Sequence, residues 1–366
     1  MAAVIKFWQG CWNFPRRRFM KFFVRKSTLL LFFFSMLAIA FYFLIGKSAL
    51  DGDVDFQFYA DSLTYERLYK ETYFDSLSDM VAVDGNFLGP LLVLELLGGG
   101  RVLVLCFNLF LLFASLRLIQ VSDNYNWSLF LIFLFLSPLT LSSLVSINKE
   151  ILSIFCFSLL VGWVFGRGAW CLIAALIVSF FVRWQLSVFI FLVVASITPV
   201  NPLRNKRFVY VSLILVAVSL VYFLVRDSFS YINVVAEQGA LSDSGSGVYS
   251  ALIALQDKGL YFLAFIPKSL HAMFGYIFKI RDLFAPANIY NDVFVALHCW
   301  VFFIMFGFAL VVGRVKLRDD LVFIAIIYCV VFVLTPIFSP RYFYPVFFLL
   351  CLVLSRRSEA VKLDNV

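Results

Sequence analysis

Long apolar runs separated by short polar segments constrain this chain most. The ranges 27–46 and 208–225 contain no charged residue, and each is long enough to cross a hydrocarbon core of about 30 Å as a helix. Of the 366 residues, 63% are hydrophobic and 14% are charged, whereas soluble domains have about 25% charged residues. So few charged residues provide too little polar surface to cover a water-soluble globule. A secreted disulfide scaffold, a nucleotide-binding α/β enzyme and a disordered chain are excluded, and the sequence predicts a polytopic helical membrane protein.

The net charge of +8 does not indicate nucleic-acid binding, because Lys and Arg stand in short clusters between the apolar runs. Such clusters mark the cytoplasmic ends of membrane helices. The seven Cys residues lie mostly inside apolar runs and form no CxxC pair, so they are interpreted as small buried hydrophobic residues. The sequence therefore predicts no nucleic-acid partner, no disulfide framework and no cysteine metal site.

The basic clusters also predict a topology. The segment 1–26 holds seven Lys and Arg residues, which favours a cytoplasmic N-terminus and a retained first helix rather than a cleaved signal peptide. With basic loops at 204–207 and 314–318 placed inside, we predict a single integral membrane domain, 1–366, with about ten spans and both termini cytoplasmic. After the first helix, the spans are predicted near 101–119, 127–146, 151–166, 170–182, 186–198, 208–225, 262–280 or 293–313, 321–338 and 342–355.

Two long segments are predicted to lie outside, at 47–100 and 226–292, and to carry short helices. Whether 262–280 crosses the membrane or lies on its surface stays open, because periodicity does not separate the two cases. The region 170–198 is interrupted by Arg183-Trp184-Gln185. It forms either two short helices or one broken span, and the basic loops favour two helices.

Charged side chains are expensive inside a membrane and usually have a partner or a function. Here they gather at the predicted outer ends of spans, at Lys149-Glu150, Arg183 and Arg341. Each has a simpler explanation: an interfacial ion pair for Lys149 and Glu150, an interfacial anchor for Arg183, and a snorkelling side chain for Arg341. Pro340 and Pro345 fix the backbone around Arg341, which favours a functional role there.

A lipid-linked pyrophosphate explains arginines and carboxylates at the outer membrane boundary. Arginine binds phosphate oxygens bidentately and remains charged, and fixed cations stabilise the charge that develops on a departing lipid phosphate. A nearby carboxylate accepts the proton of an attacking sugar hydroxyl. Tyr342 and Tyr344 offer ring faces and hydroxyls for a sugar or an isoprenoid.

At these residues the sequence resembles the bacterial polysaccharide polymerases of the Wzy and EpsG-like type. The resemblance rests on the following residues: Ala60-Asp61 and Tyr65, Asn148-Lys149-Glu150 after a span with Pro138, Arg183, and Pro340-Arg341-Tyr342 with Pro345. It implies an all-α, GT-C-like helical bundle in the bacterial inner membrane that joins undecaprenyl-pyrophosphate-linked oligosaccharides into O-antigen, capsular or exopolysaccharide. Its partners would be the lipid-linked oligosaccharide, the bilayer and a chain-length regulator protein, and it needs no cofactor.

The resemblance also implies residue roles. Glu150, with Asp61 as second choice, would be the catalytic base. The pyrophosphate and sugar would be bound by the following residues: Lys149, Arg183, Arg341, Tyr342, Tyr344, Tyr65 and Gln185. The segment 226–260 is shorter and less basic than the central outer loop of many O-antigen polymerases, so acceptor binding there stays open.

Two other classes remain. A GT-C glycosyltransferase with a polyprenyl-phosphate sugar donor would use Asp51, Asp53, Asp55 or Asp61, with a divalent metal. Those three alternating acids are also explained as a solvated loop, and we predict no metal site. A polysaccharide flippase or transporter is disfavoured, because it would place polar residues in the middle of spans.

Overall fold

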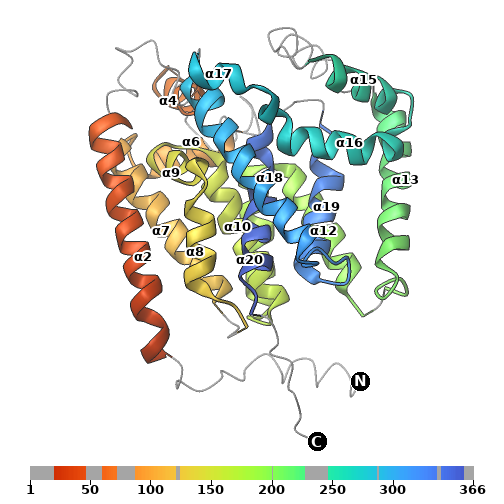
Figure 1. Cartoon of the computed structure of the whole chain (residues 1–366), viewed down its shortest axis with the longest axis horizontal. Helices are drawn as coiled ribbons and strands as arrows, with labels where there is room; N and C mark the ends of the chain where they lie inside the picture. Colours follow the sequence, from red (N-terminus) through yellow and green to blue (C-terminus); the bar gives the residue numbers. More distant parts are fainter. Residues whose placement is uncertain are drawn as a thin grey trace, which may run out of the picture.

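The computed structural model describes residues 20–46, 60–71, 87–120, 124–199, 201–226, 246–286, 288–335 and 339–357 (Figure 1). The described part is helical and contains no β-strand, apart from one isolated bridge between Tyr125 and Arg356. The helices up to the middle of the chain are α2 (Met20–Phe41), η2 (Tyr42–Gly46), α4 (Ala60–Glu71), α6 (Leu88–Leu96), α7 (Arg101–Ile119), α8 (Trp127–Phe135), α9 (Pro138–Val145), α10 (Lys149–Val164), α11 (Ala169–Val182) and α12 (Trp184–Ile197). The later ones are α13 (Arg207–Val225), α15 (Ser246–Asp257), α16 (Tyr261–Phe274), η4 (Gly275–Phe278), α17 (Ile280–Phe284), η5 (Tyr290–Val295), α18 (Ala296–Val311), α19 (Asp320–Phe332), η6 (Pro340–Phe343) and α20 (Tyr344–Ser355).

Four helical segments of the described chain are long and apolar enough to cross a membrane, and one bent pair of helices raises the number to five. The four are Lys26–Leu44, Arg101–Ile119, Arg207–Leu224 and Tyr290–Val311. Further apolar helices are shorter, at Ala169–Val182, Trp184–Ile197, Asp320–Phe332 and Pro340–Ser355. The helical membrane character predicted from hydropathy is confirmed, whereas ten spans remain a prediction.

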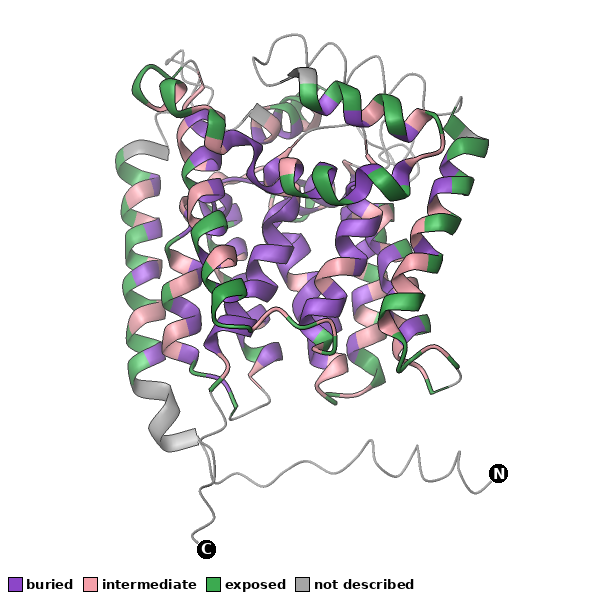
Figure 2. Cartoon of the chain, turned by 45° about the vertical axis from the view of Figure 1, so that its right-hand side comes forward, coloured by how far each residue is buried: buried purple, intermediate pink, exposed green. Residues whose placement is uncertain are grey.

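The centre of the bundle is formed by α10, α19 and α20. Every residue of α20 is buried, and most of α10 is buried as well. Figure 2 shows this arrangement, with buried residues in the central helices and exposed residues along the outer sides of α2 and α13. Exposed apolar side chains on those outer sides, such as Phe32, Phe33 and Leu220, suit contact with lipid.

The predicted span 127–146 is a broken pair of helices. α8 and α9 meet at an angle of 78°, and the bend lies at Ser137-Pro138. Proline has no N–H to continue α8 but suits the first turn of α9. The Thr140 hydroxyl donates to the Leu134 carbonyl at 2.7 Å, which satisfies an acceptor that the break exposes. The bend turns the end of α9 toward the start of α10.

The region 170–198 forms two helices, α11 and α12, with Arg183 between them in an extended conformation. The two helices pack against each other, and the hydroxyls of Ser179 and Ser187 lie 2.7 Å apart across the turn. Arg183 therefore sits at the tip of a helical hairpin, as the two-helix alternative expects.

The sequence left open whether 262–280 or 293–313 is the longer apolar helix that could cross the membrane, and the structure distinguishes the two. The long apolar segment is Tyr290–Val311, whereas α16 ends at Phe274. Figure 1 shows α16 running across the direction of α13, α18 and α19 at one end of the bundle. α16 also contacts η6, the short helix that carries Arg341.

A buried lysine, Lys268, connects α16 to its neighbours by hydrogen bonds. Lys268 Nζ donates to Gln256 Oε1 at 2.5 Å and to the Thr335 carbonyl at 3.1 Å. Gln256 Nε2 in turn donates to the Leu334 carbonyl at 2.8 Å. These contacts join α15 and α16 to the segment that follows α19 and precedes Arg341. Burial of Lys268 lowers its pKa to about 7.

This lysine predicts a pH dependence of stability. Between pH 7 and 10.5 the unfolded chain holds a proton on Lys268 that the folded chain has released, so the free energy of unfolding should rise with pH in this window. We expect Lys268→Met to flatten the rise in thermal midpoint of the purified protein across that window. Lys258→Met, at an exposed position nearby, is the control and should keep the wild-type slope. Equal slopes in all three proteins would contradict the prediction.

Candidate functional site

Four charged side chains from distant parts of the chain meet at one end of the bundle. Arg341 Nη2 lies 2.5 Å from Asp61 Oδ2, and Arg341 Nε lies 3.9 Å from Glu150 Oε1. Arg183 Nη2 lies 3.8 Å from the same oxygen of Glu150. Glu150 is thus shared by two guanidinium groups, and Asp61 binds one of them. The convergence expected from the sequence is present in the structure, and the roles of these residues remain predictions.

The start of α10 presents Lys149 and Glu150. Asn148 caps the helix, since its Oδ1 accepts a hydrogen bond from the Glu150 N–H at 3.1 Å. Its Nδ2 donates to the Ser143 carbonyl at 3.0 Å, which joins the cap to α9. A carboxylate in the first turn is favoured by the helix dipole, so Glu150 is stabilised there despite its burial.

Asn108 holds the chain that leads to this cap. Its Nδ2 lies 2.9 Å from the carbonyl oxygens of Leu144 and Ser146 and donates to them. Asn108 is buried in α7, one of the long apolar helices. A buried polar side chain in α7 therefore fixes where the irregular segment between α9 and α10 runs.

Both arginines also contact the ring of Tyr342. The ring centroid lies 4.1 Å from Arg183 Cζ and 5.7 Å from Arg341 Cζ. The Tyr342 carbonyl accepts a hydrogen bond from the Tyr328 hydroxyl at 2.5 Å, which fixes η6 against α19. Arg341 Nε further donates to Ser339 Oγ at 3.2 Å. The two guanidinium groups are held by aromatic and carboxylate contacts rather than extended into solvent.

α4 closes one side of the site with Asp61 and Tyr65, which stand one turn apart. Ser62 between them donates to the Ile147 carbonyl at 2.6 Å and so docks α4 onto the segment before Asn148. On the next turn Glu66 accepts hydrogen bonds from Arg101 at 2.8 and 3.0 Å, which anchors α4 to α7.

Tyr65 is buried beside the charged groups. Burial raises its pKa far above the usual range, and the charges of Asp61 and Glu150 raise it further. The hydroxyl therefore stays protonated and is available as a hydrogen-bond donor. Lys149 Nζ lies 5.6 Å from the Tyr65 ring centroid and 4.9 Å from that of Phe87, which completes an aromatic wall around the ammonium group.

Two predicted binding residues stand apart from these contacts. The Tyr344 hydroxyl donates to Thr140 Oγ1 at 2.7 Å, and the side chain is fully buried between α20 and α9. Its hydroxyl supports the bent α9 rather than the charged cluster. Gln185, two residues after Arg183, has a buried Oε1 that makes no hydrogen bond.

The structure adds Tyr290 to the site, which the sequence interpretation missed. Its ring centroid lies 5.8 Å from Arg341 Cζ, and it stands at the first residue of η5. The sequence feature that could have identified Tyr290 was its place directly before a long apolar run, because Glu150, Arg183 and Arg341 also stand at the ends of such runs. Phe87, which faces Lys149, precedes α6 in the same way.

The acidic residues Asp51, Asp53 and Asp55 lie outside the described residues. Within the described ranges, no group of three or more His, Cys, Asp or Glu residues is arranged to hold a metal ion.

Lys149, Arg183 and Arg341 together outnumber Asp61 and Glu150 by one positive charge. Two planar guanidinium groups lie beside one carboxylate oxygen, and guanidinium groups are well suited to bind phosphate oxygens. The excess of positive charge therefore suits an anionic ligand at Arg341 and Arg183. Comparison of the chain with protein-family models, curated proteins and solved structures finds no match.

Proposed function

We propose that this protein is a polysaccharide polymerase that joins oligosaccharide units carried on a lipid pyrophosphate, at the outer face of the bacterial inner membrane. The observation that supports this most is the shared contact of Arg183 and Arg341 with Glu150. Three segments separated by many residues bring these groups to one end of a hydrophobic bundle. A lipid pyrophosphate has its charged part at such a boundary and its isoprenoid tail in the bilayer.

Pyrophosphate binding follows from the two arginines. In the absence of ligand, Asp61 and Glu150 neutralise much of their charge. A pyrophosphate that approaches Arg341 competes with Asp61, whose side chain is 40% exposed, more easily than with Glu150, whose side chain is 4% exposed. Glu150 then continues to hold the two arginines beside each other, while Asp61 is released from Arg341.

The transfer step is a substitution at the anomeric carbon of the donor sugar. A hydroxyl of the acceptor oligosaccharide forms the new glycosidic bond, and the bond from the anomeric carbon to the pyrophosphate oxygen breaks. The pyrophosphate leaves with the electron pair, and its charge is stabilised by Arg183 and Arg341. The hydroxyl proton passes to a carboxylate.

Asp61 is the carboxylate best placed to accept this proton, because it is more accessible than Glu150. Glu150 is enclosed by two arginines and is better suited to position them. This order of the two carboxylates differs from the order that the sequence resemblance suggests. Aromatic side chains beside the cluster, Tyr65, Tyr290 and Tyr342, offer ring faces for a sugar.

The test is incubation of the purified protein with fluorescent lipid-pyrophosphate oligosaccharide. The expected product is a ladder of polymers that differ by whole repeat units, with release of lipid pyrophosphate. Arg67→Gln, an exposed change on α4, is the matched control and should give the same ladder as the wild type.

Other outcomes would replace the proposal. Addition of one sugar from a polyprenyl-phosphate donor, abolished by EDTA and restored by Mg²⁺, would identify a GT-C transferase. Movement of the lipid-linked oligosaccharide across proteoliposomes without any product would identify a flippase.

A further inference from the structure

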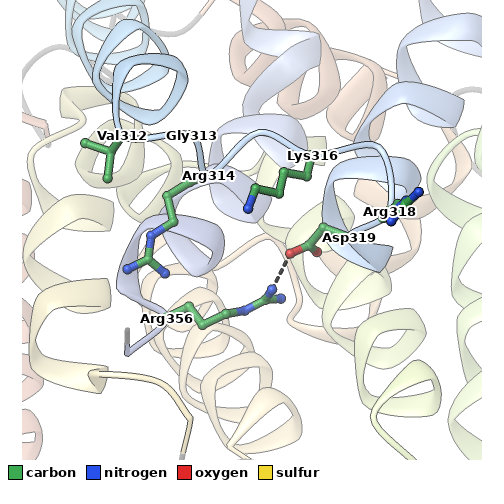
Figure 3. A pocket seen from close by; sticks show the side chains of 7 residues that line it. All are labelled: Val312, Gly313, Arg314, Lys316, Arg318, Asp319 and Arg356. Atoms are coloured by element: carbon green, nitrogen blue, oxygen red, sulfur yellow. Dashed lines mark hydrogen bonds and ion pairs between the residues drawn. The ribbon is translucent and has the colours of Figure 1, made fainter. Parts of the chain in front are cut away.

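A second cationic site lies at the other end of α20, away from Arg341. A pocket of about 490 Å³ is lined by residues from the turn between α18 and α19 and from the end of α20 (Figure 3). The lining residues are Val312, Gly313, Arg314, Lys316, Arg318, Asp319 and Arg356. They include four cations and one carboxylate, so the lining residues together carry a net charge of +3.

The turn that carries these cations is fixed by its neighbours. Gly313 adopts a φ of +66°, a conformation that glycine allows and that ends α18. Arg207 binds Asp320 and donates to the Leu317 carbonyl at 3.2 Å, so the start of α13 holds the other side of the turn. The shape of the pocket is therefore set by α13, α19 and α20 rather than by the turn alone.

The acidic groups at the pocket already have partners. Asp319 caps α19 by accepting from the Leu321 N–H at 2.9 Å, and it also binds Arg356. The neighbouring Asp320 binds Arg207. Figure 3 shows Arg314 and Lys316 extending from the turn toward the same space as Arg356, whereas Arg318 points away from it. The pocket thus presents converging cations with no second carboxylate in its lining.

An apolar strip leads to this pocket along α18. Ile304, Phe308 and Val311 recur at helical spacing on one face, and each is more than half exposed. The strip ends at Val311, directly before Val312 in the pocket lining. Exposed apolar side chains on a helix that is long enough to cross the membrane suit acyl chains.

From this juxtaposition we propose that the pocket binds the phosphate headgroup of an anionic phospholipid, whose acyl chains lie along the exposed face of α18. The cations attract the negatively charged phosphate. The adjoining apolar strip offers a surface for acyl chains, which a lipid has and a soluble anion lacks. Basic pockets beside membrane helices have the charge and position needed to bind anionic headgroups. The binding is independent of the charged cluster around Arg341 and of the function proposed for it.

Binding of fluorescent phosphatidylglycerol and phosphatidylcholine to the purified full chain in neutral detergent tests the proposal. We expect a clear preference for phosphatidylglycerol, which weakens as ionic strength rises. The double change Arg314→Gln with Lys316→Gln should weaken phosphatidylglycerol binding about tenfold or more. The matched control is Arg204→Gln with Lys206→Gln, which removes the same two charges from exposed positions at the same end of the bundle, and it should bind like the wild type.

Several results would overturn the proposal. Equal loss in the control pair would mean that diffuse surface charge attracts the lipid. Displacement of the lipid by an equal concentration of inorganic phosphate would identify a site for free anions. Equal binding of the two lipids by the wild type would exclude headgroup recognition, and this arm requires no variant. If the double variant does not fold, Lys316→Gln takes its place, and unchanged affinity there would also contradict the proposal.

Discussion

Arg341→Lys is expected to reduce polymer formation on the order of 10²- to 10³-fold, which is the usual cost of removing one preorganised charge contact in catalysis. Lysine keeps the positive charge but loses the planar fork that places Nε near Glu150 and Nη2 against Asp61. It also loses the planar group that faces Tyr342 and Tyr290. A purely snorkelling residue would tolerate the change.

The measurement is the rate of polymer formation by purified protein, together with the amount of folded protein in the membrane. Arg67→Lys on the exposed side of α4 is the matched control and should retain the wild-type rate. Arg183→Lys should show a loss of similar size to Arg341→Lys, because both guanidinium groups contact the same oxygen of Glu150. Wild-type rates for both variants at normal abundance would mean that the arginines are structural.

Exchanging the two carboxylates for amides is expected to separate a chemical role from a positioning role. Asp61→Asn should lower the rate about 10²- to 10⁴-fold, as loss of a general base does, with little change in thermal stability. Asparagine keeps a side-chain oxygen that can accept a hydrogen bond from Arg341, and Glu150 still faces that guanidinium. Glu150→Gln should lower both the rate and the stability.

The stability loss for Glu150→Gln is expected on the order of 3 kcal/mol, because two guanidinium groups lose the buried charge that faces them. Thermal denaturation in detergent and the polymer assay, run on the same preparations, measure the two effects. Glu71→Gln, at the exposed end of α4, is the control and should change neither quantity. If Glu150→Gln kept the wild-type stability but lost all polymer formation, Glu150 rather than Asp61 would be the general base.

Hydropathy alone identified this chain as a helical membrane protein. The thickness of the bilayer sets how long an apolar helix must be, and the length of an apolar run can be counted directly in the sequence. The ranges 101–119 and 208–225 coincide closely with helices α7 and α13. The same local pattern identified Glu150, Arg183 and Arg341, since charges are uncommon beside long apolar runs and stand at their ends, whereas Asp61 was suggested by the sequence resemblance. Their identity was available from the sequence, and their partners were not.

The partners depend on how helices pack, which no local pattern encodes. Ser62 bonds to the carbonyl of Ile147, and Arg341 reaches Asp61 far back along the chain, only because α4, α10 and η6 meet at one end of the bundle. The same packing engages the Tyr344 hydroxyl with Thr140, which removes it from the charged cluster. The bend at Pro138 was visible only as a proline, because its angle follows from the contacts of α8 and α9 with the rest of the bundle. The sequence thus determined which charged side chains stand at the helix ends, because the membrane disfavours them elsewhere. Tertiary packing decided which of them contact one another. An ion pair depends on distances of a few ångströms between segments that are far apart in the sequence, and hydropathy carries no information about those distances.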